Sequence, residues 1–145
     1  MYLTLENFLI SAEMKNNIEV KGMGKKIMII DDSVTMRTVV RTALKLEGFD
    51  VIEAEDGEDG IAKMKSEDVD LFICDVNMPK MDGITFVKKV KEMSNYRHIP
   101  MIMLTTEGGS DKMEEGKAAG AKAWMVKPFK HEKLIEAVKK LVPSA

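Results

Sequence analysis

The sequence predicts a single three-layer α/β domain, with helices covering both faces of a five-stranded parallel sheet. From Lys26 onward, five short apolar runs alternate with five segments of helical spacing, the pattern of repeated strand–helix units. Several of the runs are apolar at consecutive positions, as expected for strands that helices bury on both faces. The length of 145 residues leaves room for one domain of ordinary size and little beside it.

The first strand–helix unit is predicted from residues 26–54. Residues 26–30 (KIMII) form a strand, because four apolar residues follow the lysine without interruption. Ser33 is placed to cap the following helix, and Gly48 to end it. The apolar side of this helix consists of Met36, Val39, Val40, Ala43 and Leu44. A second strand is predicted at residues 51–54.

The middle of the chain predicts two more helices on either side of a third strand. A helix near residues 58–65 leads into a buried strand at residues 71–74 (LFIC). Pro79 and the Asp82–Gly83 pair then indicate a loop. The apolar side of the next helix consists of Ile84, Val87, Val90 and Met93.

The last part of the chain predicts two strands and two helices. The strands are residues 100–104 (PMIML) and 123–126 (AWMV). Between them, residues 113–119 predict a weak helix, because Gly116 lies within it and Gly120 at its end. The apolar side of the final helix consists of Leu134, Ile135, Val138, Leu141 and Val142.

Residues 1–25 do not follow this alternation. Leu5, Phe8, Leu9 and Ala12 have helical spacing, but the predicted elements include no partner helix for them. We therefore interpret residues 1–25 as an N-terminal extension, from an upstream start site or as a short linker, without an assigned function. Residues 26–145 are the predicted domain. Because the chain stops soon after Val142, we expect no output domain.

Composition argues against several classes of protein. The formal net charge is −2, so the basic face that binding to DNA usually needs is not expected. Cys74 is the single cysteine and has no internal disulfide partner, which favours a reducing, cytoplasmic location. No apolar run approaches the about 20 residues that cross a bilayer, and the N-terminus lacks a secretory signal pattern, so we expect no membrane association.

Acidic residues follow two of the predicted strands. Asp31 and Asp32 come directly after the first strand, and Asp75 directly after the third. The carboxyl ends of parallel strands meet at one sheet edge, where ligands of such folds bind. Three carboxylates gathered there repel one another by about 4 kcal/mol per pair at 4 Å in an effective dielectric of 20. A hard cation relieves this repulsion, and Mg²⁺, or Mn²⁺ in its place, suits oxygen ligands with open positions.

Two further polar residues end the other strands at the same edge. Thr105 follows the fourth strand and can donate a hydroxyl hydrogen bond to a phosphoryl oxygen. Lys127 follows the fifth strand and supplies a positive point charge. Phosphoryl transfer asks mainly for positioning and charge neutralisation, with Asp75 as the nucleophile. Each residue alone is more commonly a cap, a strand former or a solvated lysine, but their combination at one edge favours a phosphoryl-transfer site.

These motifs resemble the response-regulator receiver family over residues 26–142. The matching segments are IIDDS (29–33), DVNMPKMDG (75–83), LTT (104–106) and VKPF (126–129). The resemblance implies a flavodoxin-like (βα)5 fold with strand order 2-1-3-4-5. It also implies that a histidine kinase phosphorylates Asp75, and that the Lys127–Pro128 peptide bond is cis.

The resemblance assigns the remaining site residues as well. Asp32 and Asp75 would ligate Mg²⁺ directly, Asp31 mainly through water, and Asn77 through its backbone carbonyl. Thr105 and Lys127 would hold the phosphoryl group.

Trp124 occupies the aromatic switch position of the family. Its rotation would reshape the face formed by the fourth helix, the fifth strand and the fifth helix. Asn77, Thr106 and Glu107 would influence hydrolysis of the phosphoryl group, and Thr106 is bulkier than the residue usual at this position.

Several functions remain open at this point. Among family members the chain most resembles the single-domain chemotaxis regulators, whose output partner would be the flagellar motor switch; a separate phosphatase is an additional partner. The alternative is a stand-alone receiver that relays phosphate to a histidine phosphotransferase or regulates another protein. A magnesium-dependent phosphatase would need a second aspartate where Asn77 stands. A flavodoxin-type phosphate binder is disfavoured because Asp31 and Asp32 would repel the ligand.

Overall fold

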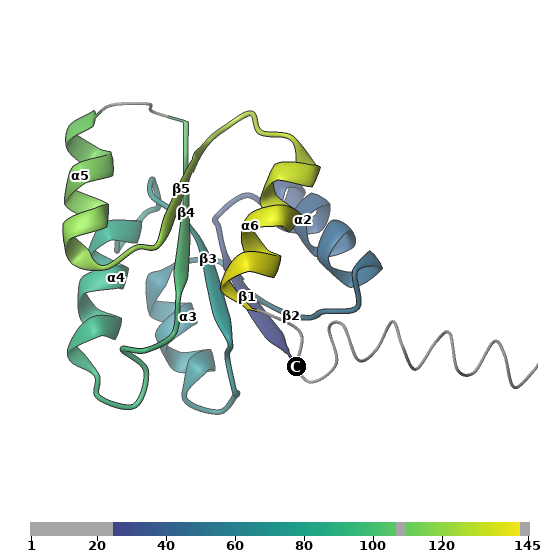
Figure 1. Ribbon diagram of the computed structural model, residues 1–145. Coiled ribbons are helices and arrows are strands. Elements are labelled where there is room, and N and C mark those ends of the chain that lie inside the picture. Colours follow the sequence, from purple (N-terminus) through teal and green to yellow (C-terminus); the bar gives the residue numbers. More distant parts are fainter. Residues whose placement is uncertain (1–24, 107–109, 143–145) are drawn as a thin grey trace, which may run out of the picture.

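The computed structural model describes residues 25–106 and 110–142. They form a parallel five-stranded sheet with the strand order β2-β1-β3-β4-β5 (Figure 1). The predicted fold class and strand order are therefore confirmed. The strands are β1 (Lys26–Ile30), β2 (Asp50–Ala54), β3 (Leu71–Asp75), β4 (Met101–Thr105) and β5 (Ala123–Val126).

Five helices alternate with the strands and cover both faces of the sheet (Figure 1). They are α2 (Val34–Leu46), α3 (Gly57–Met64), α4 (Gly83–Glu92), α5 (Ser110–Ala119) and α6 (His131–Leu141). One apolar core joins the sheet to α2 and α6, through Val40, Leu44, Leu134 and Val138. The other core joins the opposite face to α3 and α4, through Met64, Phe86, Val87 and Val90, with Ala119 of α5 packed against it.

Three helices begin at side chains that cap them. Ser33, Asp56 and Asp82 each accept a hydrogen bond from the backbone N–H three residues further on. Such caps satisfy backbone donors that have no partner within the helix. The cap at Ser33 confirms the prediction, and Gly48 follows the end of α2 with a positive φ of 90°.

The boundaries differ from the predictions at several places. Strands β3 and β4 extend to Asp75 and Thr105, so both residues still belong to the sheet instead of the loops. Helix α5 begins at Ser110 and not at residue 113. Helix α4 ends at Glu92, so Met93 is its C-cap, but Met93 still packs against the same core as the apolar side of α4.

The proposed extension, apart from Lys25, lies outside the described residues, as does Glu107. Among the helices that the structure describes, none has the length and apolar character that crossing a bilayer requires.

Candidate metal and phosphoryl-transfer site

The C-terminal edge of the sheet gathers the predicted site residues. Asp31 follows β1, Asp75 ends β3, Thr105 ends β4 and Lys127 follows β5. Strand pairing aligns these ends, because Asp75 is paired with Leu104 and Thr105 with Val126. β1 and β3 are also direct neighbours, so Asp31 and Asp75 meet where the strand order reverses.

Three carboxylates form one cluster at this edge. Asp31, Asp32 and Asp75 each place an oxygen within 4.8 Å of the others. Asp31 and Asp75 are buried, at 1% and 6% exposure, whereas Asp32 is exposed. The cluster therefore has a buried floor and one side open to solvent. Oxygen ligands in this arrangement fit a hard divalent cation that keeps several waters.

Lys127 lies against the buried floor of the cluster. Its Nζ is 3.0 Å from Asp31 Oδ2 and 3.5 Å from Asp75 Oδ1. One ammonium therefore faces two carboxylates, and together with Asp32 the four side chains carry a net charge of −2. That surplus is what one divalent cation would balance.

The electrostatics of Asp75 follow from its position. Burial raises the pKa of its carboxyl group, and the negative charge of Asp31 raises it further, while Lys127 acts in the opposite direction. Burial and the nearby charge of Asp31 therefore make ionisation of the Asp75 carboxyl group less favourable than it is for an aspartate in water. A bound cation would favour the ionised form.

The loop after β3 starts close to Asp75. The backbone N–H of Asn77 lies 3.4 Å from Asp75 Oδ1, and the Asn77 side chain is exposed. Gly83 begins α4 so near to β3 that a Cβ there would overlap the Asp75 carbonyl oxygen. The glycine therefore permits the close approach of α4 to the strand that carries Asp75.

Thr105 and Trp124 belong to the face of the sheet opposite to the one that Asp75 shares with its paired residue Leu104. Side chains alternate along a strand, so Thr105 shares its face with Met103, which is paired with Trp124. Thr105 is fully buried and Trp124 is partly buried against the core that α3 and α4 cover. Among the described residues, the Trp124 Nε1 is a buried polar atom without a hydrogen-bond partner.

Thr106, the next predicted residue, is exposed in a bend after β4. The peptide bond between Lys127 and Pro128 is cis, the geometry that the family resemblance implied.

Cys74 is fully buried beneath the site. Burial raises the pKa of its thiol, and the negative charges of Asp75 and Asp31 raise that pKa further. A neutral, enclosed thiol is a packing residue and not a nucleophile.

Arg37 is a site neighbour that the sequence analysis did not identify. Its Nη1 donates a hydrogen bond to the Asp31 carbonyl oxygen at 2.5 Å, and its Nε donates one to Glu53 at 3.2 Å. Arg41 also binds Glu53, at 2.6 Å. The available signal was two arginines at helical i, i+4 spacing soon after Asp32, although an exposed charged face has the same pattern. The contacts tie the turn after β1 to strand β2.

Comparison with known proteins identifies the class to which this fold and site belong. The response regulator receiver domain model matches residues 27–139, so the chain belongs to that family. It is 37% identical over 127 residues to the protein PilG of Pseudomonas aeruginosa, covering 88% of this chain and 94% of PilG. It is 41% identical over 113 residues to the chemotaxis protein CheY1 of Helicobacter pylori, covering 77% and 91% of the two chains.

A solved structure gives the same result. The chemotaxis protein CheY4 of Vibrio cholerae is similar with a TM-score of 0.77 and 42% identity, covering 81% of this chain and 98% of CheY4. The chain is therefore a CheY-like response regulator of a two-component system, with the flavodoxin-like receiver fold. Receiver domains generally bind Mg²⁺ and act between a histidine kinase and an output partner.

Proposed function

We propose that this protein acts in the cytoplasm, where it accepts a phosphoryl group on Asp75 from the phosphohistidine of a histidine kinase and transmits a chemotaxis signal. The observation that carries this proposal is the convergence of Asp31, Asp32 and Asp75 within 4.8 Å, with Lys127 against two of them. Four residues from three distant parts of the chain supply a nucleophile, cation ligands and a positive charge in one place.

The carboxylates and the Asn77 carbonyl would hold Mg²⁺. Three carboxylates, one ammonium and one divalent cation sum to zero charge, which leaves a site able to admit an anionic phosphoryl group. The bound ion would supply charge neutralisation and orientation for the phosphoryl oxygens.

The chain's own residues define the transfer step. An Asp75 Oδ attacks the phosphorus of phosphohistidine, the P–N bond breaks, and the imidazole leaves with the electron pair of that bond. Lys127 Nζ, already 3.5 Å from Asp75 Oδ1, pairs with a phosphoryl oxygen, and the Thr105 hydroxyl donates to another. Asn77, Thr106 and Glu107 then set how fast water removes the group, alone or with a phosphatase.

The response would travel through Thr105 to Trp124. When the Thr105 hydroxyl turns toward the phosphoryl group, it vacates space on the face that Trp124 shares. Rotation of Trp124 into that space reshapes the surface of α5, β5 and α6, where the output protein binds. The similarity to chemotaxis proteins favours a flagellar switch protein as the partner over a histidine phosphotransferase.

One experiment tests both the acceptor and the switch. The protein is incubated with acetyl phosphate or a phosphorylated kinase and Mg²⁺, and hydroxylamine-sensitive phosphate is measured together with Trp124 fluorescence. Wild type and Asp50→Asn, an exposed control in β2, should gain acyl phosphate and change fluorescence, whereas Asp75→Asn should do neither. Equal labelling of Asp75→Asn would refute the assignment of the acceptor, and an unchanged Trp124 signal in the phosphorylated protein would refute the switch.

Binding of a purified flagellar switch protein separates the two output partners. The proposal expects capture of the switch protein by the phosphorylated form only. Transfer of phosphate to a histidine phosphotransferase without such capture would instead support the relay.

A further inference from the structure

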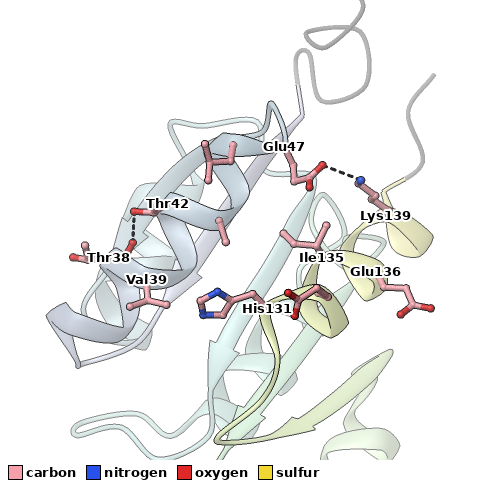
Figure 2. A pocket seen from close by; sticks show the side chains of 11 residues that line it. Thr38, Val39, Thr42, Glu47, His131, Ile135, Glu136 and Lys139 are labelled. Carbon is pink, nitrogen blue, oxygen red and sulfur yellow. Dashed lines mark hydrogen bonds and ion pairs between the residues drawn. The ribbon is translucent and has the colours of Figure 1, made fainter.

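A groove of about 770 Å³ lies between α2 and α6 (Figure 2). Val39 and Leu46 line it from α2, and Ile135 lines it from α6. Leu46 is 80% exposed and Val39 is 37% exposed. Exposed apolar side chains gathered in a concavity are typical of a surface that binds another chain segment.

Several polar side chains along the groove already have partners within the domain, although His131 and Glu132 also line it. The hydroxyls of Thr42 and Thr38 donate hydrogen bonds to backbone carbonyls one turn earlier in α2, at 2.8 Å and 2.9 Å. Glu47 and Lys139 form an ion pair of 2.9 Å across one end (Figure 2). The α2 wall therefore presents satisfied polar atoms beside exposed apolar side chains, which favours an occupant with an apolar side.

The N-terminal sequence contains an apolar pattern that suits such a groove. Leu5, Phe8, Leu9 and Ala12 recur at i, i+3, i+4 and i+7, which places them on one side of a helix. Glu6 and Glu13 fall outside that side. A helical segment with this spacing buries its apolar side only against another surface, because an isolated helix of this length is marginal in water.

The chain enters the domain close to one end of the groove. The Lys25 carbonyl accepts a hydrogen bond of 3.0 Å from the N–H of Asp50, and Asp50 is three residues after Glu47 at the groove's end. Residues 15–24 can span up to about 33 Å when extended. Helix α2, with 13 residues, is about 20 Å long, so residues 4–14 can reach any part of the groove.

We propose that residues 4–14 of this same chain dock in the α2–α6 groove as an amphipathic helix, with Leu5, Phe8, Leu9 and Ala12 facing Val39, Leu46 and Ile135. The tether favours this occupant over a separate protein. A short linker gives an effective concentration in the millimolar range, so a contact too small to hold a free partner is sufficient within the chain. The docked segment competes with any other helix for this groove.

Paramagnetic broadening in the full-length chain tests the proposal directly. Cys74 is the only cysteine and is fully buried, so a nitroxide can be attached selectively to Ser11→Cys. In the ¹⁵N-labelled protein, amide signals of α2 and α6 around the groove should be lost and then recovered when the nitroxide is reduced. Signals of α3 and α4, across the sheet, should persist throughout.

Matched variants identify the contact. Phe8→Asp and Leu46→Glu should each restore the α2 and α6 signals, while Asn7→Asp, with the same added charge on the other side of the segment, should not. Leu46 is mostly exposed, so its replacement leaves the core intact. Absent or evenly spread broadening, or broadening that survives Phe8→Asp, would overturn the proposal.

A mixed sample distinguishes the remaining occupant, a second copy of the chain. Unlabelled protein with the nitroxide is combined with ¹⁵N protein without it. The proposal expects no broadening in this mixture. Loss of α2 and α6 signals there to the same extent would assign the groove to another molecule and refute docking within the chain.

Discussion

Gly116 of α5 lies directly against the indole ring of Trp124 in β5. A Cβ at position 116 would overlap the Cζ3 atom of that ring. The absence of a side chain therefore lets the helix and the strand approach each other at this point. The sequence suggested that Gly116 only weakens α5, but its packing gives the residue a structural purpose.

Replacing this glycine should destabilise the protein even though alanine favours helices. Gly116→Ala gains about 1 kcal/mol of helix propensity and incurs overpacking of about 1–3 kcal/mol. We expect a lower Tm and a red-shifted Trp124 emission, as the ring moves toward solvent. Ala118→Gly, at an exposed position of the same helix, is the control. If helix propensity alone decided stability, Gly116→Ala would be more stable than wild type and Ala118→Gly would be less stable.

Removing the charge of Asp75 should stabilise the metal-free protein. Its pKa is raised in the folded state by burial and by Asp31, so the ionised carboxylate opposes folding. This penalty is absent below the unfolded-state pKa and complete above the folded-state pKa. In EDTA, the Tm of Asp75→Asn should thus exceed that of wild type increasingly as pH rises from about 4. A Tm difference that is independent of pH would contradict this account.

Mg²⁺ should reverse that order of stability. A ligand at 100 times its Kd adds about 2.7 kcal/mol, which corresponds to roughly 10 °C in Tm for a domain of this size. Wild type should show this gain, and Asp75→Asn and Asp32→Asn should show a much smaller one. Thermal unfolding with increasing Mg²⁺ measures it, with Asp50→Asn as a variant outside the cluster.

Arg37 should support cation binding without touching the cation. Its hydrogen bond to the Asp31 carbonyl holds the turn that presents Asp31 and Asp32. We expect Arg37→Ala to weaken Mg²⁺ binding by roughly 10-fold or more, as loss of an outer-shell partner does elsewhere. Arg41→Ala also removes a bond to Glu53, but the bond to the Asp31 carbonyl comes from Arg37, so this variant should keep an affinity near that of wild type. Equal losses in both variants, measured by calorimetry, would point to Glu53 instead.

Thr106→Ala should shorten the lifetime of the phosphorylated form or speed its formation. Thr106 is exposed directly after the buried Thr105, where its side chain can restrict the approach of water or of the phosphodonor. The decay and formation of acyl phosphate, followed in parallel with Thr42→Ala, measure the effect. Unaltered rates in both directions would show that residue 106 does not limit access.

Much of the α/β fold and of the acidic cluster could be predicted from local sequence patterns. Runs such as LFIC and MIML are apolar at every position, as expected of short strands buried on both faces, and Asp31 and Asp75 stand directly after runs of this kind. Parallel pairing then brings the strand ends together. The fold class follows from these two facts. The meeting of Asp31 and Asp75 also needs β1 and β3 to be neighbours, and that strand order was implied by the family resemblance.

Specific contacts between distant segments could not be predicted from local sequence patterns. The bond from Arg37 to the Asp31 carbonyl depends on how α2 tilts over β1, and the fit of Gly116 to Trp124 depends on the spacing between α5 and β5. Neither has a periodic signature. The caps at Asp56 and Asp82 do have a local signature, because each is an aspartate directly before a helix.

Burial differs between the strands of the sheet, so the site residues lie on strands of unequal burial. Every residue of β3 and β4 is buried, whereas none of the four residues of β5 is, and β5 is an edge strand. Local opening requires less free energy where fewer apolar contacts are broken, so amide protons of β5 should exchange before those of β3. Asp75 thus lies at the end of a fully buried strand, whereas Lys127 follows an edge strand with little burial. Phosphorylation of Asp75 can therefore shift Lys127 and β5 with a small change in free energy.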